Sequence, residues 1–224
     1  MSHDPKIAAV VFDLDGTLLD TMEYIVHAFE RVITEHGGEP DREKIIAAIG
    51  PPLVDCYEEL LPTHDAKRAS DRHHALQQTD EFLELIDEYA DVRKVVDGLH
   101  EVGVKVAIFT NRRREGVKTC FQKLKLDVEF DAIITPDDIA TGKPDPEGLF
   151  LIAKLLNIST SAMAMVGDME VDIETGKRAK VAKTIGITHG FRSREHLREA
   201  GADSIVGSLQ EVLNVIQKTN HADD

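Results

Sequence analysis

The sequence predicts an α/β protein: a parallel β-sheet covered by helices on both faces, with a purely helical segment inserted into it. Three observations carry this prediction. The apolar run Ile7–Phe12 stands near the start, strand-like and helical patterns alternate from Val92 onward, and no strand-like run occurs from about Thr21 to Tyr89. Continuous apolar runs are typical of strands buried on both faces. The 224 residues suffice for one large domain with a small insertion.

The first predicted strand ends at two carboxylates, Asp13 and Asp15, and Gly16 follows them. The carboxyl ends of the strands are where ligands bind in open α/β sheets. One carboxylate there could attack phosphorus while the other transfers protons, or the pair could bind a cation. A turn or a helix N-cap would use the same Asp-Gly pair, so a purely structural role stays open at this point.

Further strand-like runs alternate with helical patterns such as Gly116–Leu124 and Glu147–Leu156. This alternation predicts crossover helices between parallel strands, which is a Rossmann-like core. The strand-like runs are Val104–Phe109, Ala132–Ile134, Ala162–Val166, Thr184–Ile187 and Ser204–Val206.

Polar residues follow several of these runs, and all of them would meet at the carboxyl edge of the sheet. Thr110 and Asn111 could hold phosphate oxygens, and Lys143, in the loop GKPDP, could neutralise a phosphoryl group. Asp168 could reach a metal from the sheet edge, and Asp172 lies one helical turn further on the same face. Taken singly, Thr110 and Asn111 could equally be an ordinary strand exit. Lys143 could be a solvated lysine, and Asp172 could cap a helix.

The inserted segment predicts a separate domain. We expect an α/β core of residues 1–19 and 91–224 and a helical cap domain of residues 20–90. The stiff loop Ile49–Leu53 (IGPPL) could approach a ligand, or it could be a plain turn between helices. We interpret the cap histidines His64, His73 and His74 as solvated. The three arginines after Asn111, residues 112–114, could steer an anionic substrate, but we interpret them as a solvated helix start.

Composition limits the partners. The net charge of −15 makes nucleic acid an unexpected partner, and no apolar run approaches the ~20 residues of a spanning helix. No signal peptide precedes the first strand. Cys56 and Cys120 lack metal or redox spacing and suit a reducing compartment. We therefore expect a cytoplasmic protein without nucleic-acid or membrane partners; whether it is a monomer or a dimer stays open.

Four motifs in order resemble those of the haloacid dehalogenase superfamily, specifically its phosphatases with a helical cap. They are DLDGT (13–17), FTN (109–111), GKPDP (142–146) and GDxxxD (167–172), and the match covers nearly the whole chain. The resemblance implies a phosphatase with Asp13 as nucleophile and Asp15 as general acid/base. Lys143 would stabilise the charge of the nucleophile and of the phosphoryl group.

The resemblance also assigns the remaining site residues. Thr110 and Asn111 would bind the phosphoryl group. Asp13, the backbone carbonyl of Asp15 and Asp168 would hold Mg²⁺, while Asp172 would orient a water or the other groups around the metal.

The substrate would be a small phosphate ester. The segment Thr188–Asp203, together with IGPPL, resembles the phosphoglycolate phosphatase-like branch and suggests 2-phosphoglycolate. Alternatives on the same scaffold are a pyrophosphatase, a sugar-phosphate mutase and a non-catalytic phosphate-binding protein. Mutases of this kind typically have an acidic residue where this chain has Gly167, which argues against that alternative.

Overall fold

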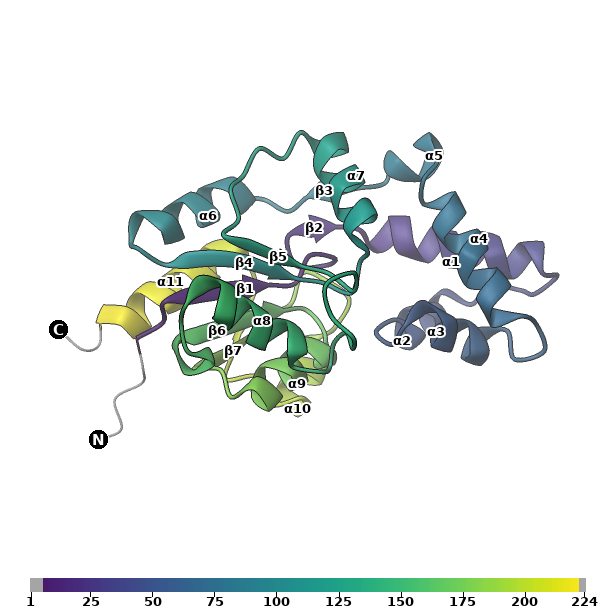
Figure 1. Cartoon of the computed structure of the whole chain (residues 1–224). Coiled ribbons are helices and arrows are strands. Elements are labelled where there is room, and N and C mark those ends of the chain that lie inside the picture. The colour runs from purple at the N-terminus through teal and green to yellow at the C-terminus, as the bar shows by residue number, and fades with distance from the viewer. Residues whose placement is uncertain (1–5, 222–224) are drawn as a thin grey trace. The chain divides into compact units, whose positions relative to one another are not determined.

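The computed structural model describes residues 6–221. The chain forms two compact units: one of residues up to Asp20 together with Glu88 onward, the other of Thr21–Asp87. The first is an α/β unit and the second is helical (Figure 1). The short strands β2 (Leu19–Asp20) and β3 (Asp87–Glu88) pair with each other at the points where the chain leaves and re-enters the α/β unit.

The α/β unit is built on a six-stranded sheet in the order β5-β4-β1-β6-β7-β8. All neighbouring strands are parallel, so all six carboxyl ends lie along one edge. The strands are β1 (Ala9–Phe12), β4 (Lys105–Phe109), β5 (Ala132–Ile134), β6 (Met163–Gly167), β7 (Lys183–Ile187) and β8 (Ser204–Val206). Each lies within one or two residues of a predicted run, so the pattern of apolar runs located the sheet correctly.

Helices cover both faces of this sheet (Figure 1). Helix α6 packs on β4 and against α11, whereas α8 packs on β4 and β5 and α9 packs on β6 and β7. Alternate strand residues such as Val11 and Phe109 form one core with Leu149 and Ile152 of α8. The predicted fold class is confirmed. The helices are α6 (Val92–Glu101), α7 (Arg114–Leu124), α8 (Glu147–Leu156), α9 (Glu170–Ala179), α10 (Arg194–Glu199) and α11 (Leu209–His221), with a 3-10 turn at Thr160–Ala162.

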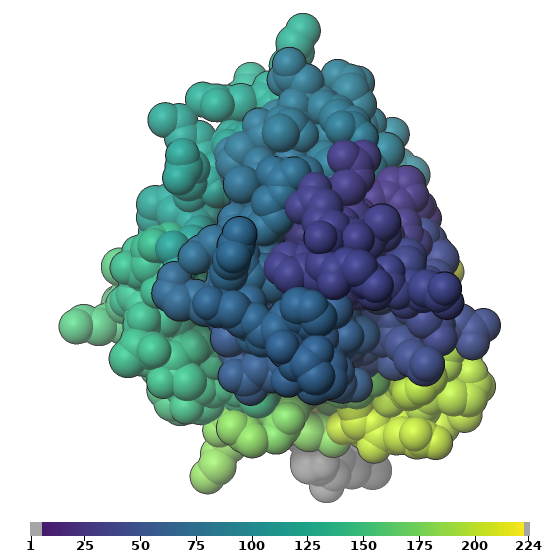
Figure 2. Space-filling model, turned by 90° about the vertical axis from the view of Figure 1, so that its right-hand side faces the viewer, coloured from purple at the N-terminus to yellow at the C-terminus, as the bar shows by residue number. Residues whose placement is uncertain are grey.

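The helical unit has its own core, and its residues are coloured purple through blue in Figure 2. Phe29 packs against Tyr57 and His73, with ring centroids 4.9 and 4.7 Å away. The Tyr57 hydroxyl lies 2.9 Å from His73 Nδ1, and both side chains are buried. Our interpretation of His73 as solvated was therefore wrong. The helices are α1 (Met22–Glu35), α2 (Arg42–Ala48), α3 (Leu53–Leu60), α4 (Ala66–Leu76) and α5 (Asp80–Leu83).

Within residues 6–221, none of the helices combines the length and the apolar character needed to cross a bilayer. Both cysteines are buried and free.

Candidate active site

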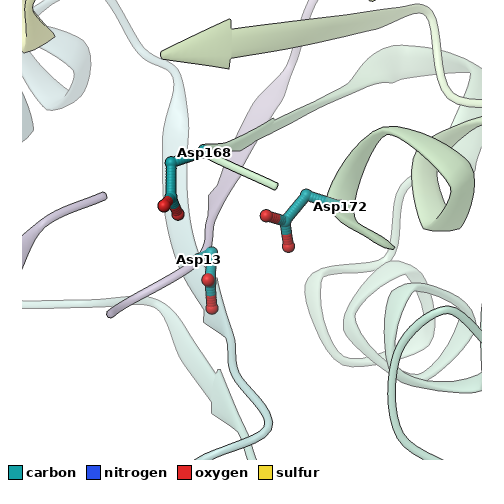
Figure 3. Close-up of side chains that lie close together, drawn as sticks. All are labelled: Asp13, Asp168 and Asp172. Atoms are coloured by element: carbon teal, nitrogen blue, oxygen red, sulfur yellow. The ribbon is translucent and has the colours of Figure 1, made fainter. Parts of the chain in front are cut away.

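The acidic cluster at the carboxyl edge of the sheet follows from the strand order. Strand β1 lies between β4 and β6, so Asp13, which follows β1, is flanked by the ends of those two strands. Asp168 follows β6, and Asp172 lies in the first turn of α9. Figure 3 shows the three side chains lying close together, although Asp13 is far from the other two in the sequence. All are buried, with at most 6% of any of them exposed.

Lys143 supplies the positive charge of this cluster. Its Nζ lies 2.6 Å from Asp13 Oδ1 and 2.6 Å from Asp172 Oδ1. Only 4% of Lys143 is exposed, so the ammonium has exchanged water for these two carboxylates. Asp172 Oδ2 accepts a hydrogen bond from the Met169 backbone, and both its oxygens are thereby engaged.

The loop that carries Lys143 is fastened to the end of β4 by Asn111. The Lys143 backbone N–H donates to Asn111 Oδ1 at 3.0 Å, and Asn111 Nδ2 donates to the Lys143 carbonyl at 3.3 Å. A side-chain carbon at Gly142 would lie 2.6 Å from Asn111 Oδ1, so glycine is required for this approach. In this structure, the Asn111 amide therefore contacts the Lys143 loop.

Asp168 is held by groups from two further loops. Thr17 Oγ1 donates to its Oδ1 at 3.0 Å, and the Phe191 backbone N–H donates to its Oδ2 at 2.7 Å. Gly16 and Gly190 border the same carboxylate, and a side-chain carbon at either position would collide with it. The glycines allow the two loops to close around Asp168, which fixes its orientation.

Burial and crowding shift the ionisation of the cluster. Burial raises the pKa of Asp13 well above its usual value, and the Asp172 and Asp168 charges add to this against the opposing effect of Lys143. Burial, followed by the Asp172 charge, raises the pKa of Asp168 to about 7. Burial opposes the charged form of Lys143, but the two carboxylates outweigh it and raise its pKa. One lysine therefore does not balance three acids.

The cluster fits a divalent cation. Asp13, Asp168 and Asp172 each offer an oxygen, and these oxygens lie within 4.8 Å of one another. Mg²⁺ prefers such hard oxygen ligands and accepts few of them from the protein. The excess negative charge that raises the carboxyl pKa values is also what a cation would neutralise.

Asp15, the other carboxylate of the first motif, pairs with Arg112. Arg112 Nη2 lies 2.6 Å from Asp15 Oδ1 and Nε lies 2.9 Å from Oδ2, with 8% and 18% of the two side chains exposed. Thr110 is buried, and its Oγ1 accepts the Arg112 backbone N–H at 3.0 Å. Our interpretation of Arg112 as solvated was wrong, whereas Arg113 and Arg114 are exposed.

The sequence analysis did not predict several contacts of the site, among them the Arg112 fork, the Phe191 N–H and the close approach of Gly190. The sequence signal for Gly190 and Phe191 was their position three and four residues after the end of β7, a predicted strand whose carboxyl end had to lie at the same edge. The signal for Arg112 was its place two residues after Thr110, where the chain had not yet entered α7.

Comparison with known proteins gives consistent results. A family model described as haloacid dehalogenase-like hydrolase matches residues 10–187. The chain is 33% identical over 217 residues to the pyrophosphatase PpaX of Listeria monocytogenes serotype 4a (strain HCC23), which covers 95% of this chain and 97% of the relative.

Two solved structures extend the comparison. A predicted phosphatase from Clostridium acetobutylicum superposes with a TM-score of 0.83 at 26% identity, covering 95% of this chain and 99% of the other. A predicted phosphoglycolate phosphatase from Haemophilus somnus 129pt has a TM-score of 0.77 at 17% identity, covering 93% and 97%. The second similarity concerns the fold alone.

Proposed function

The chain belongs to the haloacid dehalogenase-like hydrolases and is a phosphatase, and from this premise we propose that it cleaves a small phosphate compound through an aspartyl-phosphate on Asp13. The observation that carries the proposal is the buried contact of Asp13 with Lys143 at the end of the central strand. A nucleophilic carboxylate needs one oxygen fixed by a neighbouring group, while the other oxygen can approach the phosphorus. Lys143 holds Oδ1 of Asp13 and leaves Oδ2 for the phosphorus.

The reaction would proceed in two displacements. Asp13 attacks phosphorus, the bond to the leaving oxygen breaks, and Asp15 gives that oxygen a proton. Water then attacks the aspartyl-phosphate, Asp15 takes a proton from the water, and the bond between phosphorus and Asp13 breaks. The net reaction consumes one water and releases inorganic phosphate, and Asp13 and Asp15 return to their starting states.

The remaining residues bind the phosphoryl group and the cation. Thr110 stands at the end of β4 next to Asp13 and would contact the phosphoryl oxygens, while Asn111 would act through the Lys143 loop. Mg²⁺ would be held by Asp13, Asp168 and the backbone carbonyl of Asp15, and would neutralise the phosphoryl charge during transfer. Because Asp172 contacts the Lys143 ammonium directly, we assign Asp172 to orienting Lys143 and the groups around the metal.

Two substrates are the leading candidates. Pyrophosphate is favoured because a relative that is 33% identical over nearly its whole length is named a pyrophosphatase. The segment Thr188–Asp203 and the loop Ile49–Leu53, which joins α2 and α3, suggest 2-phosphoglycolate. A mutase is disfavoured because a side-chain carbon at Gly167 would collide with Asp172, leaving no room for an acidic residue there.

The test is inorganic phosphate release from a panel with Mg²⁺. The panel holds pyrophosphate, 2-phosphoglycolate, a nucleoside monophosphate and sugar phosphates, with Asp13→Asn protein as the blank. We expect release that depends on Mg²⁺ and is confined to one or two compounds, and a phosphoryl group on Asp13 that is detectable by rapid acid quench. No release above the blank, with Mg²⁺ and phosphate still bound, would overturn the proposal.

A further inference from the structure

Arg112 donates hydrogen bonds to both carboxylate oxygens of Asp15. Its Nη2 donates to Asp15 Oδ1 at 2.6 Å, and its Nε donates to Oδ2 at 2.9 Å and to Oδ1 at 3.2 Å. This is the two-pronged pairing of a guanidinium with a carboxylate, which fixes direction as well as distance. The pair joins the ends of β1 and β4, two neighbouring strands.

The surrounding structure makes room for this arginine. A side-chain carbon at Gly116, four residues on in α7, would lie 3.1 Å from Arg112 Cγ and 3.3 Å from its Cδ. Glycine is less favourable than alanine within a helix, and at this position it leaves space for the Arg112 stem. The backbone of Arg112 is fixed as well, by its N–H bond to Thr110 Oγ1. Both ends of this side chain are therefore restrained.

We propose that Arg112 is a positioning residue, which holds the Asp15 carboxylate in the orientation from which it exchanges a proton with the leaving group and with water. The inference rests on the role of Asp15 in the proposed function. An unrestrained aspartate can turn its carboxylate away, and the loss of a defined orientation slows proton transfer. Oδ2 accepts the Nε hydrogen bond, and a carboxylate oxygen has a second lone pair that the substrate could use.

A purely structural role would explain the same contacts, because the pair also fastens two strand ends. The two roles differ in their dependence on the leaving group. A positioned proton donor matters most for a basic leaving oxygen and little for one that departs readily as an anion. A weakened scaffold would slow the reaction of every ester alike.

The experiment compares phenyl phosphate with p-nitrophenyl phosphate, two esters of similar shape whose leaving groups differ in basicity. The quantity is kcat/KM, since it covers the steps up to departure of the leaving group. We expect Arg112→Ala to lower it roughly 10- to 100-fold for phenyl phosphate, within the usual range of acid–base catalysis, and only a few-fold for p-nitrophenyl phosphate. Arg112→Lys, with one ammonium in place of the fork, falls between Arg112→Ala and wild type. Arg113→Ala, at an exposed neighbour, serves as the matched control and retains wild-type rates.

A second measurement tests the inference if the enzyme hydrolyses the two aryl esters poorly or if a variant misfolds. On whichever compound the wild type hydrolyses, Arg112→Ala in an Asp15→Asn background is expected to cause no further loss. If Arg112→Ala fails to fold, Arg112→Lys and Gly116→Ala carry the test, the latter by displacing the arginine stem.

Equal losses for both esters, or full additivity with Asp15→Asn, would overturn the inference while leaving the proposed phosphatase reaction intact. An inactive wild type would instead contradict the proposed function itself.

Discussion

The two units of this protein differ in that the α/β unit contains a cluster of buried charges. In the α/β unit, Asp13, Lys143, Asp168 and Asp172 are all buried, and Lys143 contacts both Asp13 and Asp172. In the helical unit, ion pairs such as Arg72–Glu35 lie at the surface, with 43% and 34% of the side chains exposed. Burial of charge costs several kcal/mol per ion unless good partners are present, whereas an exposed pair contributes about 0–1 kcal/mol. The comparison indicates that the α/β unit gives up stability to hold a reactive cluster and that the helical unit does not.

The largest expected effect is on turnover. Asp13→Asn removes the attacking oxygen, and we expect the rate of phosphate release to fall by at least about 10³-fold. Removing one of three crowded acids should leave the melting temperature equal or higher. The matched change in the helical unit is Glu35→Gln, which should leave turnover unchanged. Residual activity of Asp13→Asn above a tenth of wild type would refute the nucleophile assignment.

The second prediction compares the loss of folding stability when a buried and an exposed ion pair are broken, and it begins with Lys143→Met. The variant leaves Asp13 and Asp172 buried without their cation, and breaking a buried pair in this way costs about 3–5 kcal/mol. The corresponding Arg72→Met in the helical unit should cost no more than about 1 kcal/mol. Thermal unfolding followed by circular dichroism would measure both. Similar losses in the two variants would mean that the burial of the cluster has no energetic consequence.

The buried acids of the α/β unit and Glu35 of the helical unit should respond oppositely to pH. The folded-state pKa of Asp168 is raised to about 7, so between pH ~4 and 7 the folded protein holds a proton that the unfolded chain has released. This contribution to stability is present at low pH and is lost as the pH rises through 7; Asp13 acts in the same direction. The hydrogen bond from Arg72 is the main cause that lowers the pKa of Glu35, so its contribution is lost as the pH falls instead.

Mg²⁺ should change the pH dependence of stability that comes from the acidic cluster, but not the part that comes from Glu35. Binding requires ionised carboxylates, so the rise in melting temperature on adding Mg²⁺ should be larger at pH 8 than at pH 5. The measurement is a series of melting curves across this range with Mg²⁺ or with a chelator. A Mg²⁺ effect that does not grow with pH would argue against the acidic cluster as the binding site.

The smallest effect concerns the buried polar contact of the helical unit. Tyr57→Phe deletes the hydroxyl that lies against His73 Nδ1, and the net value of such a hydrogen bond is about 1 kcal/mol. For a chain of this size that corresponds to roughly 2–4 °C in melting temperature. Turnover should not change. A drop in kcat beyond the loss of stability would show that this contact does more than support the core.

The sequence was sufficient for the parts of the molecule that depend on local pattern. Buried parallel strands need unbroken apolar runs, so the positions of Asp13, Thr110 and Asp168 at strand ends could be predicted, and parallel order brings such ends to one edge. The distances within the cluster depend on loop paths instead. The pinning of the Lys143 loop by Asn111 has no counterpart in any local pattern.

Arg112 and His73 were misread for a related reason. Three arginines in a row look alike, and the first of them differs by its pair with Asp15, its hydrogen bond to Thr110 and the space beside Gly116. His73 stands next to His74, yet it follows Ala69 by four residues and so lies on the buried face of α4. In both cases the side chain is polar, and its burial depends on a partner far from it in the sequence or on the packing of a helix.

The contact of Asn111 with the Lys143 backbone has a consequence for the timescale of motion at the site. The Asn111 side-chain amide is hydrogen-bonded to both the backbone N–H and the backbone carbonyl of Lys143, as a neighbouring strand would be, although Lys143 lies in a loop. Its backbone N–H should therefore exchange with deuterium slowly, on the scale of sheet amides rather than of surface loops. The ammonium would then stand ready before a substrate arrives, and little of the barrier would go into reorganising it.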